Sequence, residues 1–200
     1  MGKVNAMLTT TKSQLQIRAE EFADLLASGC FTDRQGNYIH LDEGIEQLVD
    51  LFSRAGHDNT HVFIIGNGGS AAVASHIEND LCNVGGLCAA TLHEPAILTC
   101  YANDYGYEQA FAKRLDRALR PNDILIAISS SGGSANILNA VEVARQRQAK
   151  VITLSGWQAD NPLRDSGDLN FWLEKQEYGF VEIGHLFLLH HVCDQLARHE

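Results

Sequence analysis

The sequence contains no apolar run that is long enough to cross a lipid bilayer. Its N-terminal stretch, MGKVNAMLTTTKSQLQIRAEE, also lacks the apolar core of a secretory signal. These two absences predict a cytoplasmic protein that has no membrane partner.

Paired cysteines are absent as well. The five cysteines are odd in number, scattered along the chain and never arranged as C-x-x-C. This pattern argues against a disulfide framework and against a cysteine zinc site. We expect reduced, buried thiols at Cys30, Cys82, Cys88, Cys100 and Cys193.

Positive charge is scarce. The chain has 15 Lys and Arg residues against 25 Asp and Glu residues, which gives a formal net charge of -10. That balance argues against a broad nucleic-acid-binding face. It leaves room for an anionic small molecule, because a few local donors can hold a phosphate group on an acidic protein.

What the sequence does contain is a regular alternation of predicted strands and helices. From residue 61 onwards, short apolar runs alternate with amphipathic segments, which is typical of a parallel sheet with helices on both faces. We predict an α/β fold in which a parallel sheet and its flanking helices form three layers, with an N-terminal helical extension at residues 1–58. Residues 59–200 would form the main domain, and the whole chain a single structural unit. Strands are expected at residues 61–65, 96–100, 123–128, 150–154 and 169–173, helices at 8–30, 42–54, 70–82, 107–119, 135–148 and 181–198, and a turn at 32–37.

A glycine-rich turn, GNGGSA at residues 66–71, joins the first predicted strand to a helix. Its glycines permit a tight turn, and the helix then presents free N–H groups to an anion. The spacing also fits the G-x-G-x-x-A pattern of dinucleotide-binding folds. The carboxylates that could bind a ribose, Glu78 and Asp80, lie in the predicted helix, which disfavours the dinucleotide interpretation.

A second turn, SSSGGS at residues 129–134, has the same position between a strand and a helix. Some of these serines serve as helix caps, but capping does not require four hydroxyls in so short a segment. Ligands of open parallel sheets bind at the carboxyl ends of the strands. The two turns therefore predict one shared phosphate pocket.

Histidines and carboxylates gather on two predicted helices. His76 and Asp80 are four residues apart, so they share one helix face. The last helix carries Glu182 and His190. His185 and His191, on the same helix, are interpreted as structural.

The segments FIIGNGGSA, AISSSGGSANILNAVEVAR and AKVITLSG resemble the SIS family of sugar-phosphate-binding proteins. Within it, the chain is most similar to the phosphoheptose isomerases, and ANDYG at residues 102–106 resembles a turn of that family. The resemblance implies a SIS fold of flavodoxin-like topology. It also implies a homotetramer, with residues 1–58 serving oligomerisation and residues 59–200 binding a phosphorylated sugar. The implied reaction is conversion of sedoheptulose 7-phosphate to D-glycero-D-manno-heptose 7-phosphate through an enediol.

The resemblance also implies site residues. A divalent metal, zinc by family pattern, would be held by His76, Asp80, Glu182 and His190, with Asp80 as the base and His190 as the acid. The His76 and His190 rings would then meet beside the pocket, either within one subunit or across a subunit boundary. Three positions depart from the family pattern, because Asp80 replaces a glutamate, Glu182 a glutamine and Gly179 an aspartate. The implied substrate-binding residues are Asn67, Gly68, Ser70, Asp104, Ser129, Ser130, Ser131 and Ser134.

Two alternatives stay open on the sequence. The departures from the pattern suit an isomerase of another sugar phosphate, or a non-catalytic SIS-domain protein with a binding or regulatory role. The presence of His190 favours an enzyme.

Overall fold

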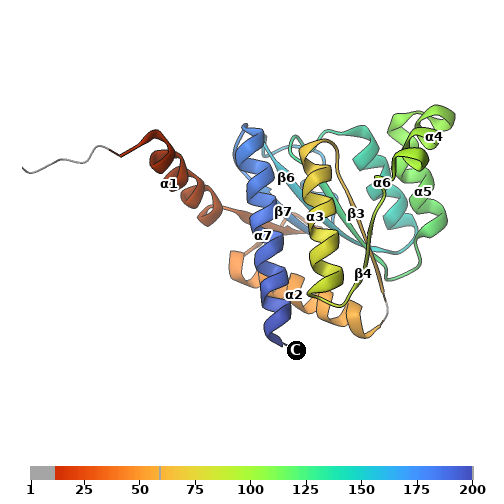
Figure 1. Cartoon of the computed structure of the whole chain (residues 1–200), viewed down its shortest axis with the longest axis horizontal. Coiled ribbons are helices and arrows are strands. Elements are labelled where there is room, and N and C mark those ends of the chain that lie inside the picture. The colour runs from red at the N-terminus through yellow and green to blue at the C-terminus, as the bar shows by residue number, and fades with distance from the viewer. Residues whose placement is uncertain (1–11, 59, 200) are drawn as a thin grey trace, which may run out of the picture.

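A seven-stranded sheet organises the computed structural model, which describes residues 12–58 and 60–199 (Figure 1). Its strand order is β2-β1-β7-β6-β5-β3-β4. The five strands from β3 to β7 are parallel to one another, whereas β1 pairs antiparallel with β2 and β7. The strands are β1 (Cys30–Asp33), β2 (Tyr38–Ile39), β3 (His61–Ile65), β4 (Cys88–Thr91), β5 (Ile124–Ser129), β6 (Lys150–Gly156) and β7 (Leu169–Leu173).

Helices cover both faces of this sheet, so the predicted three layers are confirmed. Successive strand residues point to opposite faces, and β3 shows the consequence. Val62 and Ile64 belong to a core beneath α1, α2, α3 and α7, whereas Phe63 and Ile65 belong to a second core beneath α5 and α6. The helices are α1 (Gln14–Ala27), α2 (Leu41–His57), α3 (Gly69–Asn83), α4 (Pro95–Tyr105), α5 (Ala110–Ala118), α6 (Ala135–Gln146) and α7 (Tyr178–His199), with a 3-10 turn at Tyr107–Gln109.

The parallel part of the sheet has the predicted flavodoxin-like order. Numbered by themselves, β3 to β7 run 2-1-3-4-5 across the sheet. The chain reverses its direction of winding between β3 and β5, and that reversal opens a crevice at the carboxyl ends of these two strands. The glycine turn follows β3 and the serine turn follows β5, so topology alone brings both to the crevice.

Two segments differ from the sequence prediction. Residues 96–100 belong to helix α4, where Pro95 suits the first turn and the Glu94 carboxylate caps the Ile97 N–H. The strand expected there is β4, eight residues earlier, whose small residues carry a weak β signal. The predicted turn at 32–37 is present, but short strands β1 and β2 flank it and extend the sheet.

The cysteine prediction is confirmed in one respect and wrong in another. All five thiols are free. However, Cys82, Cys88 and Cys100 are exposed and only Cys193 is buried.

Residues 8–11 of the predicted first helix lie outside the described residues. Among the described helices, none is long and apolar enough to span a membrane.

Candidate active site

The glycine turn places the start of α3 directly against the end of β3. A Cβ atom on Gly66 would lie 2.6 Å from the backbone carbon and oxygen of Ser70, so only glycine allows this close approach. Gly68 adopts φ 55° and ψ -121°, a conformation that side chains disfavour. The Gly68 carbonyl accepts hydrogen bonds from the N–H groups of Ala71 and Ala72, which starts the helix.

The serine turn supplies hydroxyl groups at the neighbouring strand end. Ser129 and Ser130 are buried, and the Ser129 and Ser134 hydroxyl oxygens lie 3.1 Å apart at hydrogen-bonding distance. The buried hydroxyl of Ser130 has no hydrogen-bond partner among the described residues. Because a buried polar atom without a partner is costly, Ser130 is suited to bind a ligand oxygen.

Both turns line one cavity of about 270 Å³, which confirms the expected shared pocket. Its lining contains no lysine or arginine, so the attraction for an anion must come from hydroxyls and from the N-terminal ends of α3 and α6. The lining residues are Asn67, Gly68, Gly69, Ser70, Ile128, Ser129, Ser130, Ser131, Ser134, Tyr178 and Glu182.

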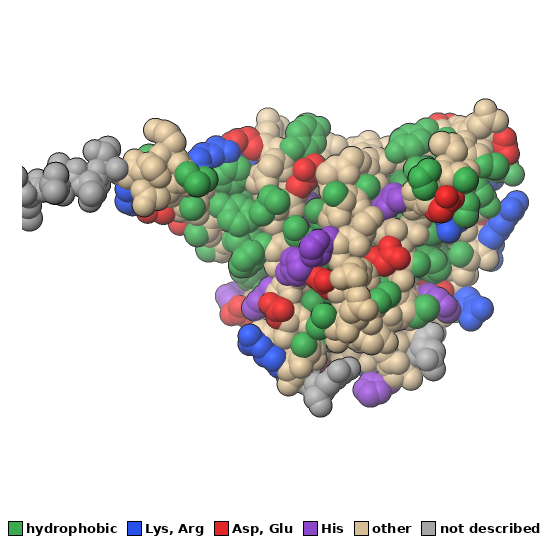
Figure 2. Space-filling view, viewed as in Figure 1, with side chains coloured by type: hydrophobic (Ala, Val, Ile, Leu, Met, Phe, Trp, Pro, Cys, Tyr) green, Lys and Arg blue, Asp and Glu red, His purple; other side chains and the backbone are tan. Residues whose placement is uncertain are grey.

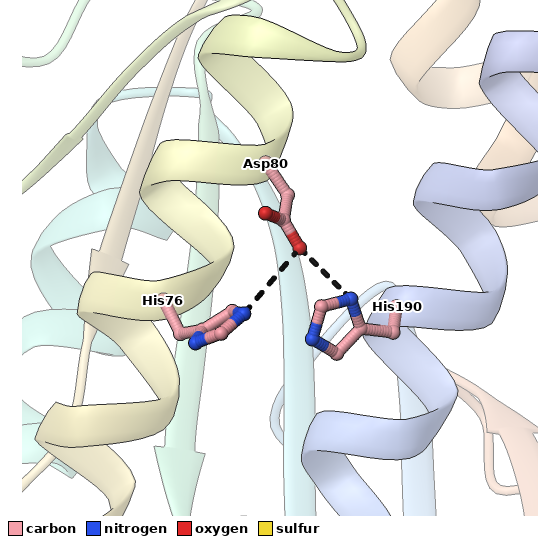
Figure 3. Close-up of side chains that lie close together, drawn as sticks. All are labelled: His76, Asp80 and His190. Carbon is pink, nitrogen blue, oxygen red and sulfur yellow. Dashed lines mark ion pairs between the residues drawn. The ribbon is translucent and has the colours of Figure 1, made fainter.

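A second polar group lies between α3 and α7, helices that pack side by side (Figure 1). Asp80 Oδ2 is 2.9 Å from Nδ1 of His190 and 3.8 Å from Nε2 of His76 (Figure 3). The two imidazole rings meet edge to face with their centroids 4.6 Å apart, as expected from the sequence. The carboxylate is thus shared between two imidazoles.

This cluster is open to solvent on one side. The side chains of His76 and His190 are 53% and 40% exposed, whereas that of Asp80 is 14% exposed. Figure 2 shows histidines at the surface in the middle of the face that carries α3 and α7. A ligand can therefore reach the imidazoles directly, and Asp80 through the exposed part of its side chain.

Comparison with known proteins agrees with this architecture. The model of the SIS domain family matches residues 37–156. A phosphoheptose isomerase of Helicobacter pylori is 33% identical over 165 residues, which cover 80% of this chain and 85% of that protein. The chain belongs to the phosphoheptose isomerase family of SIS-domain proteins.

Solved structures of phosphoheptose isomerases have the same fold. The one from Neisseria gonorrhoeae superposes with a TM-score of 0.74 at 28% identity, covering 92% of this chain and 94% of that one. The structure from Francisella tularensis superposes with a TM-score of 0.76 at 26% identity, covering 94% of this chain and 100% of that one. The similarity therefore includes the N-terminal helices, beyond the region that carries the sequence motifs.

Glu182 departs from the phosphoheptose isomerase pattern in sequence, and the structure does not place it where the pattern implied. It was expected to join His76, Asp80 and His190 as a metal ligand, but the structure does not bring it to that cluster. A Cβ atom on Gly69 would lie 2.1 Å from Glu182 Oε2, so the carboxylate is packed against the first turn of α3. Within one chain, the eight residues from Glu182 to His190 rise about 12 Å along a helix, which keeps the carboxylate away from His190.

Other expected residues divide between the cavity and the surface. Asn67, Gly68 and the serines line the cavity, whereas Asp104 lies exposed near the end of α4 and does not. Tyr178 also lines the cavity and was missed by the sequence analysis. Its spacing of four residues from Glu182 on one helix face was the signal that could have identified it.

Proposed function

We propose that the protein is an aldose–ketose isomerase that converts sedoheptulose 7-phosphate to D-glycero-D-manno-heptose 7-phosphate through an enediol. One observation carries the proposal. The hydroxyl-rich cavity lies at one end of α3 and α7, and the His76–Asp80–His190 cluster lies further along the same helices. Six residues separate Ser70 from His76, a rise of about 9 Å, so an extended heptose phosphate is long enough to contact both.

The phosphate would bind in the cavity. Hydroxyls of Ser70, Ser129, Ser130, Ser131 and Ser134 can donate to its oxygens, and backbone N–H groups at the two helix starts add to them. The unpartnered Ser130 hydroxyl is the strongest support for such a ligand. The sugar chain would then extend toward the histidines.

Asp80 and His190 would carry out the proton transfers. Asp80 removes a proton from C1 of the ketose, and His190, which contacts the same carboxylate, returns a proton to C2. A hydroxyl proton passes from O1 to O2, so the aldose forms with no external oxidant or reductant. The two side chains lie 2.9 Å apart, so both would face the same enediol, and proton exchange with solvent would restore them for the next turnover.

The same cluster suits a divalent metal ion, zinc in our proposal. Two imidazoles and a carboxylate are ligands that zinc accepts, and the ligand atoms lie within 4.8 Å of one another. Such an ion, when bound, would polarise the carbonyl and hydroxyl oxygens of the sugar. Metal analysis of protein purified without chelator is expected to find a stoichiometric divalent ion that the His76→Ala variant loses.

Turnover of sedoheptulose 7-phosphate by the purified protein tests the function directly. His190→Ala is expected to lower kcat by about 10²- to 10⁴-fold, because a proton-transfer group is lost. His191→Ala, at the exposed neighbouring position, is the matched control and should keep wild-type turnover. A wild-type protein without aldose product, or a His190→Ala variant at full rate, would refute the proposal.

One observation favours a second candidate, an isomerase of another sugar phosphate. Glu182 places a carboxylate in the cavity, where the family pattern has a neutral amide. A carboxylate accepts hydrogen bonds from sugar hydroxyls and repels phosphate oxygens. A panel of aldose and ketose phosphates of different chain length would rank the two candidates by kcat/KM.

We also propose that the chain forms homotetramers through its N-terminal helices and works in the cytoplasm. Helix α1 projects from the body of the molecule (Figure 1). Apolar side chains are exposed on it and on the neighbouring α7, namely Leu15, Ile17, Ile183 and Phe187. Five free thiols suit a reducing compartment.

A further inference from the structure

The side chain of Asn67, in the glycine turn, is held by a neighbour from the other side of the crevice. Asn67 Nδ2 donates to Asn136 Oδ1 at 2.9 Å, and Asn136 Nδ2 donates back to Asn67 Oδ1 at 2.9 Å. Asn136 is the second residue of α6, directly after the serine turn, and is only 3% exposed. This closed amide pair joins the two turns that form the cavity.

A third group fixes the Asn67 carboxamide further. The Tyr107 hydroxyl donates to Asn67 Oδ1 at 2.8 Å. Both lone pairs of that oxygen are thereby occupied, since it already accepts from Asn136. One of the two N–H donors of Asn67 is used by Asn136, and the other has no partner among the described residues. The side-chain group that Asn67 has left for a ligand is therefore a donor and not an acceptor, and Asn67 lines the cavity.

We propose that Asn136 and Tyr107 are positioning residues that orient Asn67 to donate to an oxygen of the bound sugar phosphate. The inference rests on the proposed function of the cavity as a sugar-phosphate site. Every oxygen of a phosphate dianion is an acceptor, so an orientation that offers only an N–H suits that ligand. Neither Asn136 nor Tyr107 is among the residues that line the cavity, so both would act through Asn67.

A double-mutant cycle separates this role from simple stabilisation of the fold. Asn136→Ala and Tyr107→Phe are each expected to raise KM for sedoheptulose 7-phosphate about fivefold with little change in kcat, as expected when one neutral hydrogen bond to the ligand is lost. When either substitution is added to Asn67→Ala, KM should stay at the value of the Asn67→Ala single variant. Dissociation constants from calorimetry should follow the same pattern.

The matched control is Asn139→Ala. Asn139 lies one turn further along α6 and donates to the Glu108 carbonyl at 2.9 Å, so it also links α6 to the segment containing Tyr107. It makes no hydrogen bond to Asn67 among the described residues, and its loss should leave KM at the wild-type value.

The outcomes distinguish the inference from the function on which it rests. If the wild-type protein turns over the sugar phosphate but Asn136→Ala leaves KM unchanged, the positioning role is overturned and the function stands. Independent effects of Asn67→Ala and Asn136→Ala that multiply in the double variant would also overturn it. If the wild-type protein neither binds nor converts sugar phosphates, the proposed function fails and the inference fails with it.

Discussion

His185 illustrates how burial decides the role of a single residue. Its side chain is fully buried on α7, where Nε2 lies 3.0 Å from the Ser155 carbonyl oxygen and Nδ1 has no partner among the described residues. Burial lowers the pKa of His185 to about 4. The ring is therefore neutral near pH 7, which supports its interpretation as a structural histidine.

This shift predicts a loss of stability in acid. The unfolded chain takes up a proton at His185 as the pH falls below about 6.5, whereas the folded chain resists until about 4. The contribution of His185 to the free energy of unfolding is therefore fully present above pH 6.5. It decreases by about 3 kcal/mol as the pH falls to 4. Urea unfolding at pH 7 and pH 4.5 measures the free energy of unfolding at each pH. Its decrease between the two pH values should be smaller for His185→Gln than for wild type. His191→Gln, at an exposed position on the same helix, controls for the loss of a histidine. Equal decreases in unfolding free energy for His185→Gln and wild type would contradict the prediction.

Glu182 gives a second prediction at this scale. Its carboxylate lies in the cavity against the start of α3, so it repels an incoming phosphate. Glu182→Gln is expected to tighten the binding of inorganic phosphate about tenfold, as measured by calorimetry. Glu174→Gln makes the same charge change at an exposed position outside the cavity and should leave binding as it is. A weaker Glu182→Gln complex would show that the carboxylate assists the ligand.

At the scale of elements, the start of α3 depends on its close approach to β3. Gly66→Ala would place a methyl group 2.6 Å from the backbone of Ser70, and that backbone can yield only if the helix moves. We expect a loss of about 2 kcal/mol of unfolding free energy, the cost of overpacking, together with weaker phosphate binding. Gly133→Ala, in the serine turn, is the control, because its added Cβ atom would meet nothing within 4 Å. Equal stabilities of the two variants, measured by urea unfolding, would refute this account.

At the scale of the whole molecule, the apolar surface of α1 and α7 governs the proposed self-association. Phe187 is 56% exposed and packs edge to face on Phe22 of α1. Phe187→Glu would bury a charge in an interface formed there, so we expect analytical ultracentrifugation to show smaller species than for wild type. Ile97→Glu, a similar change on α4, should leave the assembly intact. A wild-type protein that sediments as a monomer would contradict the proposal.

The sequence by itself determined the layers of this protein and the two turns that form its cavity. Apolar strands such as residues 124–129 are buried on both faces and so are recognisable without tertiary context. Short elements were harder to predict, because β1, β2 and β4 are stabilised by pairing with neighbours that are distant in sequence. For the same reason, the local pattern predicted a helix end at residue 30 and a turn at residues 32–37, and it missed the two short strands beside that turn.

Only the tertiary structure decided which polar side chains meet. Spacing on one helix predicted that His76 and Asp80 share a face, and the family resemblance predicted that His190 and Glu182 join them. The packing of α3 on α7 brings His190 to them but leaves Glu182 at the cavity. Asn136 and Tyr107 carried no sequence signal that would pair them with Asn67. Helical periodicity is a local property of the chain, whereas contacts between helices depend on how the sheet positions their axes, and only the folded structure contains that information.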